Sequence, residues 1–294
     1  MCCFCVQFKL ALEKMMIQFK LEQDHEHSNY RYVQVDGGHC SEREGSNHTF
    51  CNATGAVCKN GVACAPSPPL LTRDGLGNLT NYTGMTWVGF RPSDNECGKH
   101  NVPVNALVSI AMRKTAELCR AVYKDEVLAK LAESLAGEIE EGIATYGTVP
   151  NPGKPGEKIY AYSTDGLGNN TLIDDANTPS LLSLDYFGWK GDPAVMKSTR
   201  EFVLSERNPW YHVGPCAKGI GSSHTPGQMI WPMALISQAI TSTDEAEIGG
   251  ALQMILNSDC STGYIHESFS SANGCQFTRD YFAWPSSCLL QPIA

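Results

Sequence analysis

Two long amphipathic segments follow one another in the middle of the chain and limit the folds open to it. Residues 104–122 carry apolar side chains at helical spacing, at Leu107, Ile110, Ala111 and Leu118. Residues 124–146 repeat the pattern, at Val127, Leu128, Leu131, Leu135, Ile139 and Ile143. Such spacing puts one apolar stripe on each helix, and each stripe must be buried against a neighbour. The two segments therefore predict a helical hairpin.

Further helices are predicted on both sides of this hairpin. Residues 1–20 are amphipathic, residues 193–204 begin with a proline suited to a first helical turn, and residues 228–240 are apolar like a buried helix. Ser242 and Glu245 have the spacing of a capping box for a helix ending near residue 257, and residues 277–290 predict a last helix. No segment alternates convincingly like a strand. We therefore expect an all-α fold, an α/α toroid forming one domain over residues 1–294.

Residues 36–86 form a long irregular stretch, rich in Cys, Asn and Gly, inside this domain. A loop of such length is usually functional, although a glycosylated insertion is the alternative. The chain has 13 cysteines, and four of them lie in this stretch, at Cys40, Cys51, Cys58 and Cys64. They lack the Cys-x-x-Cys spacing of a zinc site. Asn-x-Ser/Thr sequons stand at Asn47, Asn52, Asn78, Asn81 and Asn169. Together these features predict the secretory pathway, the Golgi lumen or the cell exterior.

Charge and hydropathy exclude two kinds of partner. The net charge of −9 and the absence of a basic stripe argue against nucleic acid. No run reaches the roughly 18–20 apolar residues of a membrane span. Residues 1–20 also lack the basic-then-apolar order of a signal peptide, so no signal or anchor for the secretory pathway is found in this chain.

Two loops carry acidic residues suited to acid–base chemistry. Asp174 and Asp175 precede Asn177 and could provide a catalytic carboxylate, or could simply favour a helix dipole. Glu267 follows His266 between Cys260 and Cys275, and a disulfide between those cysteines would hold Glu267 as rigidly as a general base requires. The alternative is a His and Glu that only cap a loop. The spacing is not His-Glu-x-x-His, so a zinc protease is excluded.

Other polar side chains are candidates for sugar binding. Arg91 and Asp94 flank a rigid turn at Pro92. They could hydrogen-bond to sugar hydroxyls, or they could form a structural ion pair. His224 ends a glycine-rich loop, where a buried structural histidine is equally expected. His25 and His27 point to different faces of a helix, which argues against a metal site. Tryptophans are mostly core candidates, of which one or two could stack on a sugar.

No Gly-x-Ser-x-Gly elbow is present, so a serine hydrolase has no support. Two separate acid-bearing loops among helices suit the cleavage of a glycosidic bond best.

Nine motifs, in this order, resemble those of glycoside hydrolase family 125, the exo-acting α-1,6-mannosidases whose fungal members are meiotically up-regulated, Golgi-type proteins. The likeness extends from about residue 7 to residue 287. The motifs are Tyr-Thr-Gly-Met-Thr-Trp (82–87), Phe-Arg-Pro-Ser-Asp (90–94), Asp-Asp-Ala-Asn (174–177), Asn-Pro-Trp (208–210), Gly-Ile-Gly-Ser (219–222), Ile-Trp-Pro (230–232), His-Glu-Ser-Phe (266–269), Phe-Thr-Arg (277–279) and Phe-Ala-Trp (282–284).

This resemblance implies an (α/α)6 barrel, an inverting mechanism and no metal or other cofactor. It places the general base at Glu267 and the general acid in the Asp174–Asp175 pair, with Asp174 favoured. The substrate would be a mannose-containing glycan, bound by Trp87, Arg91, Asp94, Asn177, His224, His266 and Arg279. Two alternatives stay open, a catalytically inactive mannose-binding protein and another α/α-toroid glycosidase such as an α-glucosidase.

The sequence departs from the family pattern at both ends. The family's N-terminal helices carry a Gly-Asp-Ile-x-Ala-Met-Trp-Leu-Arg-Asp-Ser motif that has no match here. Near the C-terminus Pro285 and Ser286 stand where the family has Ala-Asn. We therefore expect a barrel that is incomplete on its N-terminal side, and an isolated chain that is inactive or unstable because apolar surface is left uncovered.

Overall fold

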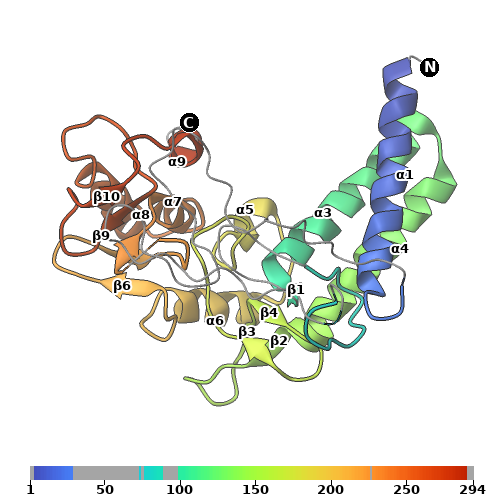
Figure 1. Cartoon of the computed structure of the whole chain (residues 1–294), viewed down its shortest axis with the longest axis horizontal. Helices are drawn as coiled ribbons and strands as arrows, with labels where there is room; N and C mark the ends of the chain where they lie inside the picture. The colour runs from blue at the N-terminus through green and yellow to red at the C-terminus, as the bar shows by residue number, and fades with distance from the viewer. Residues whose placement is uncertain (1–2, 29–72, 74–75, 89–98, 226, 290–294) are drawn as a thin grey trace.

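The computed structural model describes residues 3–28, 73, 76–88, 99–225 and 227–289. Helices predominate, in agreement with the predicted class (Figure 1). They are α1 (Cys3–Gln23), α3 (Val102–Leu118), α4 (Glu126–Gly142), α5 (Leu184–Phe187), α6 (Pro193–Val203), α7 (Pro232–Ile240), α8 (Glu245–Leu256) and α9 (Ala283–Leu289). Two π-helical turns, η1 (Cys119–Tyr123) and η2 (Ile143–Gly147), extend α3 and α4. Of the described helices, none combines the length and apolarity needed to cross a bilayer.

The predicted hairpin is confirmed as α3 and α4, and local chemistry explains its ends. The Asn101 side chain accepts the Val104 amide (3.0 Å) and starts α3, with Pro103 in the first turn. Lys124 adopts a left-handed φ of 54°, which reverses the chain. The Asp125 side chain then accepts the Leu128 amide (2.9 Å) and starts α4. The amphipathic N-terminal segment is confirmed as α1, which packs beside α4 (Figure 1).

Short strands join the helices, and the sequence did not predict them. They are β1 (His100–Asn101), β2 (Thr148–Pro150), β3 (Lys158–Tyr160), β4 (Ser163–Thr164), β5 (Asn170–Thr171), β6 (Tyr211–Val213), β7 (Lys218–Ile220), β8 (Met229–Ile230), β9 (Ser268–Ser270) and β10 (Phe277–Thr278). All the described pairings are antiparallel, in the orders β1-β4-β5, β10-β9-β8, β2-β3 and β6-β7. Strands of two or three residues are too short to show the alternation that identifies a strand in sequence.

Three predicted helix starts are wrong. Residues 229–230 form β8, so the apolar helix α7 begins only at Pro232. Asp244, not Ser242, caps α8, because its carboxylate accepts the Ala246 amide at 2.9 Å. Residues 277–278 pair as β10, and the last helix begins at Ala283. Backbone pairing decides the first and last of these cases, where apolar composition alone is ambiguous.

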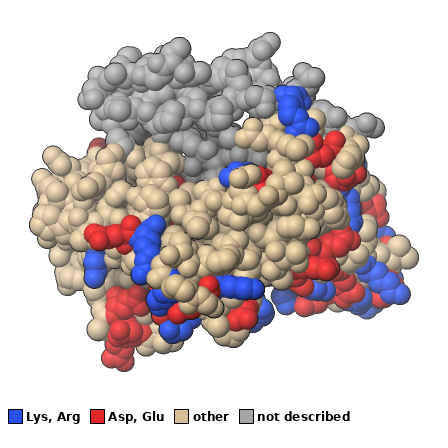
Figure 2. Space-filling view, turned by 90° about the horizontal axis from the view of Figure 1, so that it is seen from below, with Lys and Arg blue, Asp and Glu red and all other residues tan. Residues whose placement is uncertain are grey.

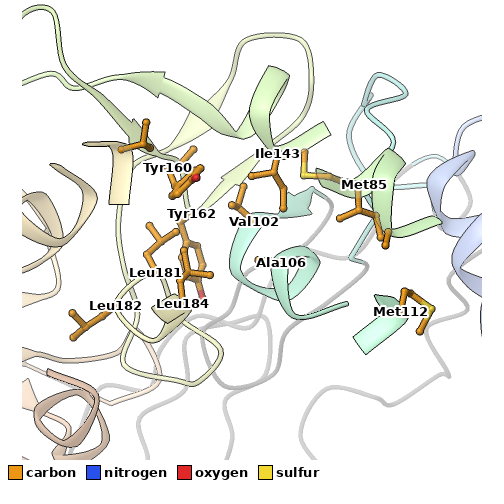
Figure 3. Close-up of a cluster of buried hydrophobic side chains, with 14 of the residues drawn as sticks. Met85, Val102, Ala106, Met112, Ile143, Tyr160, Tyr162, Leu181, Leu182 and Leu184 are labelled. Carbon is orange, nitrogen blue, oxygen red and sulfur yellow. The ribbon is translucent and has the colours of Figure 1, made fainter. Parts of the chain in front are cut away.

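The described residues form two apolar cores. The larger core includes residues of α3, α4, η2 and α5, and Figure 3 shows Val102 and Ile143 near Tyr162 in it. The smaller core lies between α7, α8 and β9, around Leu235, Ile255 and Phe269. The predicted loop 36–86 falls outside the described residues except for residues 73 and 76–86.

Surface charge is mixed on the face shown in Figure 2, where basic side chains lie among acidic ones. Ion pairs account for part of this pattern. Arg113 contacts Glu140 (2.6 Å) and Arg120 contacts Glu133 (2.5 Å), and both pairs link α3 or η1 to α4. Exposed pairs of this kind contribute little stability, at most about 1 kcal/mol each.

Candidate active site

Asp174 holds the backbone of its own loop. It is fully buried, and its two carboxylate oxygens accept the amides of Leu181 (2.8 Å) and Leu182 (3.0 Å). Its own amide donates to the Asn208 side chain (3.1 Å), whose Nδ2 donates in turn to the Asp174 carbonyl (3.2 Å). Buried backbone amides need such acceptors. The described contacts of Asp174 therefore fix the segment that leads into α5.

Asp175 connects the same loop to the glycine-rich segment at residues 219–223. One carboxylate oxygen accepts the Asn177 amide (3.0 Å) and its side-chain Nδ2 (2.6 Å). The other accepts the Ser222 hydroxyl (2.8 Å) and the Ser223 amide (3.2 Å). Asn177 Nδ2 also lies 3.1 Å from Ser222 Oγ. Asp175, Asn177 and Ser222 are all buried. This cluster joins two of the predicted motifs across 45 residues of sequence.

A chain of backbone hydrogen bonds continues from this cluster to Glu267. The Ala176 amide donates to the Gly221 carbonyl (3.0 Å), and the Trp231 amide donates to the Ile220 carbonyl (3.1 Å). Next to Trp231, Ile230 on β8 pairs with Phe269 on β9, two residues after Glu267. The two acid-bearing loops predicted from sequence are therefore connected through the segments at residues 220–221 and 230–231, although about 90 residues separate them.

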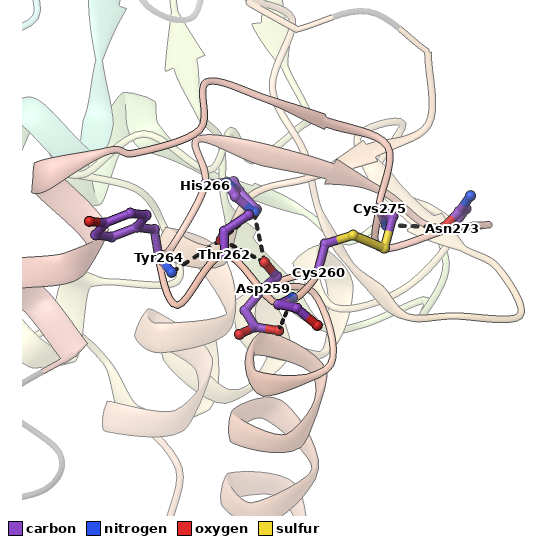
Figure 4. Close-up of a disulfide and its surroundings, with 8 residues drawn as sticks. Asp259, Cys260, Thr262, Tyr264, His266, Asn273 and Cys275 are labelled. Atoms are coloured by element: carbon purple, nitrogen blue, oxygen red, sulfur yellow. Dashed lines mark hydrogen bonds between the residues drawn. A yellow bond between two sulfur atoms is a disulfide. The ribbon is translucent and has the colours of Figure 1, made fainter.

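A disulfide joins Cys260 and Cys275, as predicted from the sequence (Figure 4). Glu267 lies in the loop that this disulfide closes. Its side chain is only 3% exposed. Its amide donates to the Thr278 carbonyl at 3.2 Å. Arg279 Nε lies 3.3 Å from Glu267 Oε2, an ion pair without hydrogen-bond alignment. Within the described part of the chain, no residue donates a hydrogen bond to either carboxylate oxygen.

His266 serves the loop rather than the space beside Glu267. It is 1% exposed, and its ring is stacked on Phe277 with centroids 3.6 Å apart. Nδ1 lies 3.1 Å from the Arg279 carbonyl and Nε2 lies 3.3 Å from the Asp259 carbonyl, the latter drawn in Figure 4. These contacts match the loop-capping alternative that the sequence left open. A contact between His266 and sugar stays a prediction.

An aromatic series links Arg279 to His224. The Arg279 guanidinium lies over the Phe282 ring (5.2 Å), Phe282 meets Trp231 edge to face (6.1 Å), and Trp231 meets His224 (6.2 Å). The half-exposed Trp284 lies 6.4 Å from Phe282. From the sequence, Trp231 and Trp284 were core candidates or possible stacking partners of a sugar, and Phe282 had no predicted role of its own. The only sequence feature that could have indicated this series is the aromatic content of the motifs at residues 230–232 and 282–284.

Trp87, Arg91 and Asp94 are not brought into this group by any described contact. Trp87 is 2% exposed, its ring stacks on His25 (3.6 Å) and its amide donates to the Glu22 carbonyl (3.2 Å), so it belongs to the region of α1 and α3. Arg91 and Asp94 lie outside the described residues. His27 is exposed next to Asp24, away from buried His25, and the described residues hold no cluster of three potential metal ligands.

A cavity of about 690 Å³ opens elsewhere, between α3, η2 and the start of α6. Its lining includes Arg113, Tyr160 and Trp189 but none of the predicted site residues. The contacts around Asp175 and Glu267, rather than cavity size, mark the candidate site, because acid–base chemistry depends on placed carboxylates.

Comparison with known proteins gives a consistent set of relatives. A family model described as metal-independent alpha-mannosidase (GH125) matches residues 63–294. The meiotically up-regulated gene 157 protein of Schizosaccharomyces pombe is 37% identical over 207 residues, which are 69% of this chain and 40% of that protein. A metal-independent α-mannosidase of Streptococcus pneumoniae, solved as a non-productive complex with α-1,6-mannobiose, superposes with a TM-score of 0.81 and 33% identity, over 97% of this chain and 61% of its own.

A bacterial glucoamylase, solved with acarbose, shares the fold at a TM-score of 0.52 and 13% identity, over 69% of this chain and 35% of its own. Both solved structures are glycosidases, which supports the helix-rich glycosidase type of fold. The chain spans 40% of the fungal relative and 61% of the streptococcal one.

Proposed function

The chain belongs to glycoside hydrolase family 125, the metal-independent α-mannosidases, and on that premise we propose that it removes terminal α-1,6-linked mannose from glycans with inversion of configuration. The observation that carries the proposal is the superposition on the streptococcal mannosidase in complex with α-1,6-mannobiose. We also propose an (α/α)6 barrel as the complete architecture, and a secretory compartment with glycosylation at the sequons as its setting.

Glu267 is the proposed general base. Inversion requires a water molecule between the base and the anomeric carbon. A carboxylate that is nearly buried, held by its loop and free of hydrogen bonds from the described residues can take that water and its proton. The disulfide and the β9–β10 pairing limit its movement, and an accurately placed base is what makes proton transfer efficient.

The Asp174–Asp175 pair is the proposed source of the general acid. For an inverting enzyme its carboxyl should lie roughly 6.5–9.5 Å from that of Glu267. The described hydrogen bonds of the Asp174 carboxylate come from backbone amides, whereas Asp175 also accepts one from Ser222 in the loop that leads to His224. Hydrogen bonds accepted by a carboxylate stabilise its ionised form, so these contacts do not favour either residue as the acid. The resemblance favours Asp174, and each residue needs its own substitution.

Steady-state kinetics of the full-length protein on α-1,6-mannobiose, with NMR detection of the first-formed anomer, test the proposal. We expect the β-anomer first. Glu267→Gln and the variant of the true acid should each lower kcat about 10²–10⁴-fold with mannose binding retained. Glu247→Gln, at a half-buried ion pair on α8, is the control and should keep full turnover. Full turnover by Glu267→Gln would contradict the proposed base.

The remaining outcomes separate the alternatives. Full turnover by both Asp174→Asn and Asp175→Asn, with loss in Asp94→Asn, would move the acid to the motif at residues 90–94. Binding of mannose without any cleavage would identify an inactive mannose-binding protein. Preference for a glucoside would identify an α-glucosidase.

A further inference from the structure

The β9–β10 hairpin brings Arg279 next to the candidate base. Ser268 pairs with Thr278 and Phe269 with Phe277, and Glu267 and Arg279 are the residues just beyond the Ser268–Thr278 pair. The Glu267 amide donates to the Thr278 carbonyl (3.2 Å), and Arg279 Nε lies 3.3 Å from Glu267 Oε2. The end of the hairpin therefore holds the two side chains in contact.

The backbone of Arg279 is held in an uncommon conformation. Its φ is 54°, in the left-handed region that L-residues other than Gly, Asn and Asp seldom adopt. The carbonyl oxygen of Arg279 lies 3.1 Å from His266 Nδ1, within hydrogen-bond distance. Because His266 is buried and stacked on Phe277, it can hold this turn in place. Unfavourable backbone conformations persist where the surroundings enforce them, often beside functional groups.

The turn directs the Arg279 side chain between two neighbours. Its guanidinium covers the face of Phe282 at 5.2 Å while Nε faces the Glu267 carboxylate. The Arg279 side chain is 32% exposed and that of Glu267 is 3% exposed, so the cation shields the anion from one side. A guanidinium contacts an aromatic face and a carboxylate at once better than an ammonium does, because it is planar and carries several donors.

We propose that Arg279 is a positioning residue for Glu267 rather than a residue that binds the sugar. His266 holds the turn that directs the Arg279 side chain toward Glu267. This inference rests on the proposed role of Glu267 as the base. Arg279 would keep the carboxylate oriented toward the attacking water. His266 then acts through the Arg279 carbonyl and needs no contact with substrate.

Arg279→Gly is the most informative variant, because a φ of 54° suits glycine and the loss of the side chain should not disturb the fold. We expect kcat on α-1,6-mannobiose to fall about 100-fold, as for a base displaced by about 1 Å. KM and the Kd for mannose should stay within about threefold of their original values. Arg279→Lys, or added guanidinium ion with Arg279→Gly, should recover part of the lost kcat.

Arg200→Gly is the matched control for the loss of a half-buried arginine. Arg200 pairs with Glu247 at 2.8 Å, between α6 and α8 and away from Glu267. It should lower the unfolding midpoint without changing kcat. An unchanged kcat in Arg279→Gly would overturn the proposal. A raised KM and Kd with kcat retained would overturn it in favour of sugar binding, and loss of the folded state would overturn it in favour of a structural role.

A double-mutant cycle of Glu267→Gln and Arg279→Gly on the denaturant midpoint needs no activity. Non-additive shifts are expected because the two side chains interact, and additive shifts would overturn the proposal. If the unsubstituted chain cleaves no mannoside while the cycle is non-additive, the proposed function fails and the contact stands. The two failures are therefore distinguishable.

Discussion

Acid should destabilise this protein through His100, a buried histidine at the start of β1. The side chain is 1% exposed, and Nε2 lies 3.2 Å from the Asn81 carbonyl. Burial lowers the pKa of His100 from 6.5 to about 4, because the charged ring would lose its hydration, and nearby His25 adds to this effect. The contact with the Asn81 carbonyl and the nearby backbone of Thr86 and Met85 oppose this effect only in part.

The size and the sign of the effect follow from these two pKa values. Below about pH 6.5 the unfolded chain binds a proton at His100, whereas the folded chain does not until about pH 4. The stabilisation that depends on a neutral His100 is therefore fully present above about pH 6.5. The free energy of unfolding falls as the pH drops from there toward 4. A difference of about 2.5 between the pKa values, at about 1.36 kcal/mol for each unit, amounts to about 3 kcal/mol.

Urea unfolding between pH 7.5 and pH 4.5 measures this term in the unsubstituted chain and in His100→Gln. Glutamine keeps a donor for the Asn81 carbonyl but cannot titrate. We expect the variant to lose about 2–3 kcal/mol less stability on acidification than the unsubstituted chain does. His27→Gln, at a side chain that is 80% exposed, is the control and should reproduce the original pH dependence. Parallel curves for His100→Gln and the unsubstituted chain would refute the assignment.

Two further outcomes are expected. Replacing Cys260 and Cys275 with serine should lower the free energy of unfolding by about 3 kcal/mol, the chain-entropy value for a loop with a separation of 15 residues. It should also lower kcat, because the loop that carries Glu267 loosens. An unchanged urea midpoint would contradict the entropic estimate. EDTA should leave mannosidase turnover unchanged, as expected for a metal-independent family. Activity that is lost with EDTA and restored by calcium or zinc would contradict this expectation.

Sequence patterns predicted the helices well, because their apolar stripes and caps are local. The α3–α4 hairpin, α6 and the Cys260–Cys275 disulfide agree with prediction. The strands were missed because each depends on a partner elsewhere in the chain, as β8 depends on β9. Composition alone could not distinguish strand β8 from the start of helix α7.

In the candidate site, too, local features could be predicted from the sequence, whereas contacts between distant residues could not. The Asp174–Asp175 pair, His266 and Glu267 were identifiable as residue types in loops. The contact of Asp175 with Ser222 could not be inferred, because 47 residues separate them. The stacking of Trp87 on His25 likewise depends on the packing of α1. Trp231 and Phe282 carried only an aromatic signal, which is equally typical of a core.

The contacts between the two acid-bearing loops indicate which features of the site a substitution can change. Backbone hydrogen bonds at Ala176, Ile220 and Trp231, and the β8–β9 pairing, connect the loops. These bonds do not depend on side-chain identity, so the spacing of the loops belongs to the fold. Side-chain partners also contact each carboxylate, Ser222 and Asn177 for Asp175 and Arg279 for Glu267. Substitution of such a partner should therefore lower kcat while the loops stay in place.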